Sequence, residues 1–238
     1  MALKSETRDK LKGVSTATLA TALYKRGFRS QFVQGVLPLR PMKESMVGEA
    51  YTLRYMPARE DLNTLDVFRD RSHPQRKAVD ECPPGAVMVM DSRKDARAAS
   101  AGAILVTRLM ARGAAGVVTD GGFRDAAEIA ALDIPAFHQR PSAPTNLTLN
   151  QAIDVNVPIG CGDAPVFPGD VVVGDNDGVI ILPAHLADEL AAEAVEMTAY
   201  EDFAAERVRG GQSIMGLYPA TDPSNLEAFA AWRKERGR

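Results

Sequence analysis

The chain has few of the residues that mark several protein classes. Its 238 residues include only two cysteines, Cys82 and Cys161, and three histidines. Two cysteines are too few for a disulfide framework, and neither lies in a Cys-x-x-Cys or paired-histidine pattern typical of a zinc site. We expect two buried, unreactive thiols in a chain that belongs to the reducing cytoplasm.

A strong positive charge and long apolar runs are also missing. The formal net charge is −3, whereas proteins that bind nucleic acid or anionic membranes usually carry a basic surface. No stretch approaches the roughly 20 apolar residues of a membrane-spanning helix. The first residues, MALKSETRDKLKG, lack the apolar core of a signal peptide. We therefore expect no nucleic-acid partner, no membrane partner and no secretion signal.

What is present is typical of a folded α/β protein. Apolar residues make up 45 % and charged residues 25 % of the chain, which is the balance of an ordinary globular protein. The sequence has no flexible linker and no repeat, so we expect a single domain over residues 1–238. Within it, residues 1–183 are expected to form an α/β body and residues 184–238 a helical C-terminal extension at a subunit interface.

The clearest local pattern lies at residues 86–120. Two short apolar runs, AVMVMDS and AGVVTD, flank a helical pattern that includes Ala101, Leu105 and Leu109 and closes at Gly113. This order predicts a strand, a helix and a second strand parallel to the first. A short helix, AAEIAALD, and a third strand, IPAFHQ, are expected to follow.

The two ends of the chain differ from this middle part. Residues 5–27 predict helix, with a cap at Ser15 or Thr16. Residues 147–183 predict strands separated by Pro-Gly-Asp and Asn-Asp-Gly turns. Residues 184–209 predict a long helix. A last helix carries Phe229 and Trp232, which we expect to dock on the body or on a neighbouring copy.

Two residues of opposite charge follow the second buried strand, in GVVTDGGFRD. A turn needs only Gly121 and Gly122, so the pair Arg124 and Asp125 needs another reason. The glycines would let the backbone bend so that both side chains face one ligand. Arginine binds carboxylates through a fork of donors, and aspartate oxygens bind hard divalent cations. A solvated ion pair on a surface turn is the simple alternative.

The start of the helix in this unit is a second candidate site. Gly102, Ile104 and Leu105 open that helix after a strand. Free backbone N–H groups at a helix start bind anions, although a plain helix terminus explains the same pattern.

The polar segment of residues 58–85 contains a basic cluster. Arg69, Arg71, Arg76 and Lys77 lie close together, beside His73. Such a cluster is usually a solvated face, although it can attract an acidic substrate. We expect His73 at the surface, in a segment able to form a lid.

The block GAILVTRLMARGAAGVVTDGGFRD resembles the RraA-like family, which holds the regulator of ribonuclease E activity A and the 4-hydroxy-4-methyl-2-oxoglutarate aldolases. VGEAYTLR, the Pro-Gly-Asp to Gly-Val run at residues 168–179 and ERVRGGQSIMGLYP extend the resemblance over essentially the whole chain. The long tail resembles the longer branch of the family. The resemblance implies a swivelling β/β/α fold, assembled as homotrimers or homohexamers with active sites shared between subunits.

The activity implied by the resemblance is that of a carbon–carbon lyase. Family aldolases cleave 2-oxo acids to release pyruvate and often decarboxylate oxaloacetate, with Mg²⁺ or Mn²⁺ as the cofactor. By resemblance, Arg124 binds the substrate carboxylate, Asp125 helps to hold the metal, and the amides of Ile104 and Leu105 hold the pyruvyl group. His138, at the end of the third strand, is either a substrate contact or a structural residue.

The metal site of the family also uses a carboxylate from the C-terminal helix of the adjacent subunit, through water. Glu201 is the best match in this chain, with Asp202 and Glu196 as alternatives. The resemblance thus implies that a complete metal site needs two copies of the chain.

One position departs from the family pattern. Family aldolases usually carry an acidic residue directly after the glycine that matches Gly102, where it helps to position a proton-transfer water, and here that residue is Ala103. Asp120 or His138 is a candidate to replace the acid. The missing acid favours a second function, that of a non-catalytic regulator that binds and inhibits a ribonuclease. The length of the chain, beyond that of the compact regulators, argues against it.

Overall fold

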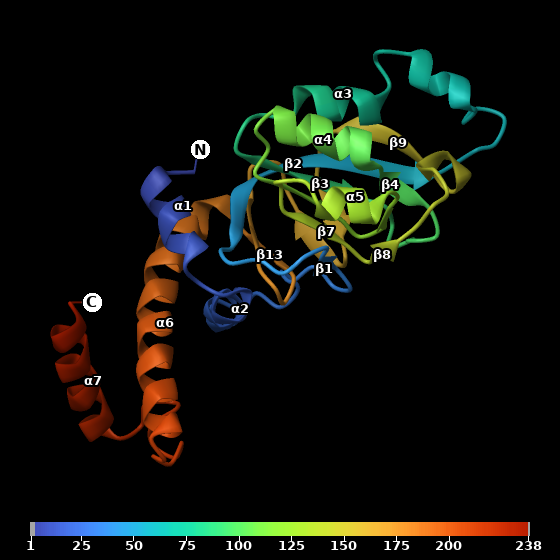
Figure 1. Cartoon of the computed structure of the whole chain (residues 1–238). Coiled ribbons are helices and arrows are strands. Elements are labelled where there is room, and N and C mark those ends of the chain that lie inside the picture. The colour runs from blue at the N-terminus through green and yellow to red at the C-terminus, as the bar shows by residue number, and fades with distance from the viewer. Residues whose placement is uncertain (1–2, 238) are drawn as a thin grey trace.

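The computed structural model describes residues 3–237 (Figure 1). Its helices are α1 (Ser5–Lys12), α2 (Thr16–Lys25), α3 (Pro74–Glu81), α4 (Ala103–Ala111), α5 (Ala126–Ala130), α6 (Ala187–Arg209) and α7 (Pro223–Arg236), with 3-10 turns η1 (Leu65–Arg69), η2 (Asn146–Thr148) and η3 (Ala184–Leu186). Its strands are β1 (Leu37–Pro38), β2 (Met46–Pro57), β3 (Ala86–Asp91), β4 (Ala99–Ala101), β5 (Gly116–Thr119), β6 (Gly122–Phe123), β7 (Ala136–His138), β8 (Arg140–Pro141), β9 (Asn150–Val155), β10 (Ile159–Cys161), β11 (Ala164–Val166), β12 (Val171–Gly174) and β13 (Val179–Leu182).

The main sheet is mixed, with a parallel centre. Its strand order is β1-β7-β5-β3-β2-β12-β13, and β9 pairs with the far end of β2. β2, β3, β5 and β7 run parallel, which confirms the predicted strand–helix–strand unit around α4. β3 and β5 are buried along almost their whole length, as expected for parallel strands covered on both faces. α3, α4 and α5 lie together on one face (Figure 1).

One segment of the chain brings the two edges of the sheet together. Phe32 bridges Ile180 of β13, and the amide of Val33 donates to the carbonyl of Val179 at 2.8 Å. A few residues later, Leu37 of β1 pairs with His138 of β7, at the opposite edge. The sheet is therefore nearly closed, and the protein has the mixed α/β fold with a C-terminal helical part that the sequence predicted.

A small parallel sheet, β4-β6-β8, leads directly into the Arg124–Asp125 pair and corrects one prediction. Ala101, which was expected in the helical pattern, lies in β4. The chain bends at Gly121, as expected, although neither Gly121 nor Gly122 has a positive φ. They are required for close packing, because a Cβ on Gly121 would lie 2.7 Å from the Cβ of Ser92 and one on Gly122 would lie 2.7 Å from that of Ser142.

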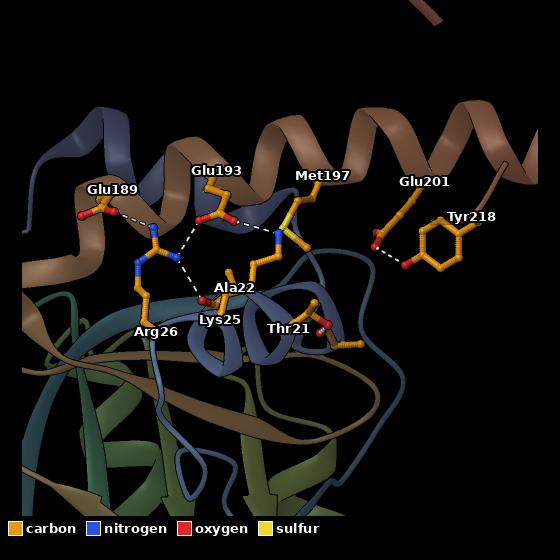
Figure 2. A network of polar contacts seen from close by, with 10 residues as sticks. Thr21, Ala22, Lys25, Arg26, Glu189, Glu193, Met197, Glu201 and Tyr218 are labelled. Atoms are coloured by element: carbon orange, nitrogen blue, oxygen red, sulfur yellow. Dashed lines mark hydrogen bonds and ion pairs between the residues drawn. The ribbon is translucent and has the colours of Figure 1, made fainter. Parts of the chain in front are cut away.

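The N-terminal helices hold the first half of α6 against the body. Ser15 caps α2, accepting from the amide of Thr18 at 3.1 Å, as predicted. Arg26 donates to Glu189 at 2.5 Å and to Glu193 at 2.6 Å, and both acids lie on α6 (Figure 2). These contacts fix the direction in which the rest of α6 leaves the body.

The second half of α6 extends away from the sheet, and α7 runs back beside it (Figure 1). Phe203 of α6 packs against Phe229 and Trp232 of α7, with ring centroids 5.5 and 5.9 Å apart. Within the chain, Phe229 and Trp232 therefore dock on α6 and not on residues 1–183, which corrects the first of the two expected placements, while contact with a neighbouring copy stays a prediction. Among residues 3–237, no helix is both long and apolar enough to cross a membrane.

Both cysteines are buried free thiols, as predicted. Burial raises the pKa of Cys82 to about 11. It also raises the pKa of the Cys161 thiol well above its usual value. Because the thiolate is the reactive form, neither cysteine is suited to nucleophilic chemistry.

Candidate active site

A cavity of about 320 Å³ lies where the small sheet meets the helices on the main sheet. η1 and α3 form one wall, the start of α4 forms another, and the turn after β6 forms a third. The volume is at the lower end of the range for small-molecule sites. The lining includes these sequence-predicted residues: Gly102, Ile104, Leu105, Arg124 and Asp125.

The Arg124–Asp125 pair faces this cavity because of a sharp change of backbone direction. The amide of Arg124 still pairs with the carbonyl of Ala101, at 3.1 Å. Asp125 has φ 58° and ψ 35°, in the left-handed region, and α5 begins at the next residue. Arg124 Nε lies 3.6 Å from Asp125 Oδ2, with side chains that are 49 % and 38 % exposed. Both groups are therefore open to a ligand.

Gly102 is needed because the charged pair packs directly against its α carbon. A Cβ at this position would lie 2.7 Å from Arg124 Cγ and 2.9 Å from Asp125 Oδ2. The backbone of Gly102 is extended, so the requirement is for space and not for an unusual φ. Asp125 Oδ2 also accepts from the amide of Ala103, at 3.3 Å. The carboxylate thereby satisfies one free donor in the first turn of α4.

The first turn of α4 offers fewer free amides than expected. The amide of Leu105 donates to the carbonyl of Gly102 at 3.1 Å, and that of Ala103 is used by Asp125. Within the described part of the chain, the amide of Ile104 has no acceptor, and its side chain is 84 % exposed. Ile104 thus supplies the donor that remains available for an anion at this helix start.

The wall opposite Arg124 is a buried polar network that the sequence did not reveal. Gln75 Nε2 donates to the carbonyl of Ser100 at 2.7 Å, and the hydroxyl of Tyr55 donates to the same carbonyl at 2.9 Å. Gln75 Nε2 also lies 3.3 Å from Asn146 Oδ1. Gln75 and Asn146 line the cavity. A polar residue at a buried helical position was the available signal for this wall.

His73 is buried, which contradicts its expected surface position. Its ring packs edge-on against Phe68, with centroids 5.2 Å apart, and the guanidinium of Arg76 lies 4.3 Å from the Phe68 ring centre. Burial, followed by the charge of Arg76, lowers the pKa of His73. Phe68 of η1 and Arg76 of α3 both line the cavity.

His138 lies on β7, stacked on Phe123 at 5.6 Å between ring centroids. Burial lowers its pKa to about 4, and its Nδ1 has no hydrogen-bond partner in the part of the chain described. It is not among the residues that line the cavity. Its role as a substrate contact stays a prediction.

The carboxylate of Asp120 is hydrogen-bonded to backbone amides inside the protein. Its carboxylate accepts from the amides of Ser92 at 2.6 Å, Lys94 at 3.1 Å and Gly162 at 3.1 Å. The residue is fully buried, and burial raises its pKa to about 6. These contacts join three loops, and the geometry therefore fits a structural carboxylate.

Glu201 lies on α6, away from this cavity in the single chain. It accepts from the hydroxyl of Thr18 at 2.9 Å. It also accepts from the hydroxyl of Tyr218 at 3.2 Å (Figure 2). The alternative Glu196 pairs with Arg233 at 2.5 Å. None of the acids predicted on α6, including Asp202, lines the cavity. Their role therefore requires a second copy of the chain.

The cavity lining offers one carboxylate as a ligand for a divalent cation. Among residues 3–237, no group of three or more histidine, cysteine, aspartate or glutamate side chains is placed to hold an ion. Asp125 is the single carboxylate in the cavity lining. Mg²⁺ often binds through one or two carboxylates and keeps several waters. Asp125 would be the residue that holds it.

Comparison with known proteins agrees with this fold. The sequence pattern of the RraA-like family, described as Aldolase/RraA, matches residues 16–181. The match covers more than half of the chain and includes the start of α4 and the Arg124–Asp125 turn. The chain belongs to the RraA-like family.

Three relatives illustrate the range of names in the family. A "Putative 4-hydroxy-4-methyl-2-oxoglutarate aldolase" from Halalkalibacterium halodurans is 36% identical over 131 residues, 55% of this chain and 61% of that protein. A protein of the same name from Thermus thermophilus is 31% identical over 122 residues, 51% of this chain and 73% of that protein. The crystal structure of RraAS2 from Streptomyces coelicolor, an "unusual member of the RNase ES inhibitor RraA protein family", matches with a TM-score of 0.76 at 28% identity, over 86% of this chain and 98% of that chain. The chain thus spans less than two thirds of the Halalkalibacterium protein.

Proposed function

We propose that the protein is a divalent-metal-dependent lyase that cleaves 2-oxo acids to release pyruvate, by retro-aldol cleavage, by decarboxylation of oxaloacetate, or by both. The observation that carries the proposal is the packing of Arg124 and Asp125 against the start of α4, in one cavity. A guanidinium, a carboxylate and a free helix-start amide meet there. The aldolase names of the relatives from Halalkalibacterium and Thermus support the same reaction class.

Each group has a role in the proposed reaction. Arg124 binds the carboxylate of the 2-oxo acid through its fork of donors. The amide of Ile104 donates to the pyruvyl oxygens, where negative charge develops as the carbon–carbon bond breaks, and one such donor is worth about 3 kcal/mol. A bound Mg²⁺ or Mn²⁺ would supply Lewis-acid stabilisation of that charge. Asp125 would hold the ion, with its carboxylate kept in place by the amide of Ala103.

We further propose that the active unit is a homotrimer or homohexamer with shared sites. Glu201 lies in the second half of α6, where it contacts Thr18 of α2, and it does not line the cavity of its own chain. In a closed assembly, this acid would reach the cavity of the adjacent copy.

A direct test measures pyruvate release from oxaloacetate and from a set of 4-hydroxy-2-oxo acids. The proposal expects release with Mg²⁺ or Mn²⁺, loss with EDTA and recovery when the metal is restored. Release that is unaffected by EDTA would contradict the metal role. Absence of release from every acid would contradict the lyase.

A second candidate function is that of a regulator that binds a ribonuclease. The observation in its favour is Ala103, which leaves the start of α4 without a side chain able to position a proton-transfer water. The structural neighbour from Streptomyces, whose description names an RNase-inhibitor family, also favours this function. Co-purification with a ribonuclease and inhibition of its activity would support this function, and absence of both would remove it.

A further inference from the structure

We infer that Arg76 is a specificity-determining residue, which binds a second carboxylate at the far end of the 2-oxo acid. The inference rests on the proposed function, because it takes the end of the substrate held by Arg124 as its starting point. Arg76 comes from α3 and lines the same cavity as Arg124.

The charge of the cavity is the first argument. Its lining contains two guanidinium groups, Arg76 and Arg124, and one carboxylate, Asp125. Asp125 lies 3.6 Å from Arg124, so the charge of the lining without a counter-charge is that of Arg76. With a divalent cation held by Asp125, as proposed, the lining and the ion together carry more positive charge than one ligand carboxylate can balance. Among residues 3–237, Arg76 forms no ion pair with an aspartate or glutamate. An excess of positive charge in a half-enclosed cavity favours a dianion over a monoanion.

The orientation of Arg76 is the second argument. Its guanidinium lies over the ring of Phe68, 4.3 Å from the ring centre. Stacking on an aromatic face covers the plane of the guanidinium and leaves the N–H groups at its edge free to donate. His73 packs edge-on against the same Phe68 ring, so the ring is itself held in place. Arg76 is thus oriented before a ligand arrives.

The polar neighbours of Arg76 are already occupied. Gln75 Nε2 is used by the carbonyl of Ser100 and by Tyr55. Asn146 Nδ2 donates to the carbonyl of Asn150 at 3.2 Å, and Thr145 donates to Asn146 Oδ1 at 3.3 Å. The side-chain donors of this wall therefore satisfy one another, and Arg76 is the group left to bind an anion.

The experiment compares two acids of the same length by calorimetric titration with Mg²⁺ present. 2-Oxoglutarate ends in a carboxylate, 2-oxopentanoate ends in a methyl group, and neither carries the 4-hydroxyl group that cleavage requires. We expect the wild-type protein to bind 2-oxoglutarate at least about tenfold more tightly, the effect of one charge-assisted hydrogen bond. Arg76→Gln should remove this preference, and Arg76→Lys should restore part of it. Lys77→Gln, at the exposed neighbouring position on α3, should leave it unchanged.

Three results would overturn the assignment of Arg76: equal binding of both acids, binding of neither, or a preference that survives in Arg76→Gln. Thermal melting of each variant checks that the fold is kept. The binding measurement does not need turnover. An Arg76-dependent preference without pyruvate release from any hydroxy acid would support the role of Arg76 and contradict the lyase. Pyruvate release without a preference for 2-oxoglutarate would support the lyase and contradict the role of Arg76.

Discussion

Gly102 decides where the charged side chains of the cavity lie. Gly102→Ala would place a methyl group 2.7 Å from Arg124 Cγ and 2.9 Å from Asp125 Oδ2, so both side chains must move. We expect pyruvate release to fall by about tenfold or more, because displacing catalytic groups by a fraction of an ångström is costly. The melting temperature should change little, since the backbone of Gly102 is extended.

The matched control for Gly102→Ala is Gly160→Ala. A Cβ at Gly160 would meet nothing within 4 Å, so this variant should keep wild-type activity. Equal activity of Gly102→Ala and wild type would show that the packing of Arg124 and Asp125 against α4 does not matter for the reaction.

His138 predicts a dependence of stability on pH. Burial lowers its pKa from 6.5 to about 4, so the folded state keeps the ring neutral while the unfolded chain takes up a proton below pH 6.5. The free energy of unfolding should therefore fall as the pH drops from about 6.5 through about 4. In His138→Phe, which keeps a ring against Phe123, this part of the loss should disappear. Urea unfolding at pH 7 and pH 5 measures the loss of unfolding free energy in both proteins. An identical loss in wild type and His138→Phe would show that protonation of His138 is not its cause.

At the scale of elements, the sequence predicts helices and strands whose apolar residues repeat at a clear spacing or that end at a clear turn or cap signal. The parallel unit around α4, the cap at Ser15 and the long helix α6 follow from such local signals. β4, β6 and β8 were not predicted, because strands of two or three residues with small side chains or proline have no readable alternation. The sequence indicated the bend at Gly121 but not the close packing that both Gly121 and Gly122 allow, because glycine serves either purpose.

The sequence predicted the wall of the cavity that contains Arg124 and Asp125, but not the wall that contains Gln75 and Arg76. Arg124 and Asp125 are adjacent in sequence to recognisable strand and helix signals, and they line the cavity with Gly102. The wall of Gln75 and Arg76 depends on the pairing of β2 with β3, which brings α3 over the sheet. Such long-range pairing has no local signature, so the basic cluster around Arg76 was visible but its position was not.

The hairpin of α6 and α7 should behave as a local unit. Phe203, Leu217 and Trp232 form a small core that is separate from the core of the body. Trp232→Ala should therefore reduce the hydrogen-exchange protection of α7 and of the second half of α6 and leave the central strands unchanged. Leu226→Ala, at a position that is 51% exposed on α7, should have no effect. Loss of protection throughout the body in Trp232→Ala would show that the hairpin supports the whole fold.

At the scale of the whole molecule, the proposed assembly can be tested by mixing two inactive variants. Arg124→Ala removes a group of one chain's own cavity, and Glu201→Gln removes the acid proposed to come from the adjacent chain. If sites are shared, a mixed assembly contains some sites with both native residues, and its activity should exceed the average of the two variants. Light scattering should give a mass of three or six chains. Activity equal to the average would contradict shared sites.

The central claim is that the cavity at Arg124 performs the chemistry. The most direct measurement is the kcat/KM for metal-dependent pyruvate release by wild type, Arg124→Ala and Arg140→Ala. Arg140 is an exposed arginine on the adjacent strand β8, so its loss should have little effect. We predict that Arg124→Ala loses about a hundredfold or more, as expected for a charged group that binds the reacting end of the substrate. Wild-type pyruvate release by Arg124→Ala would show that the reaction does not use this cavity.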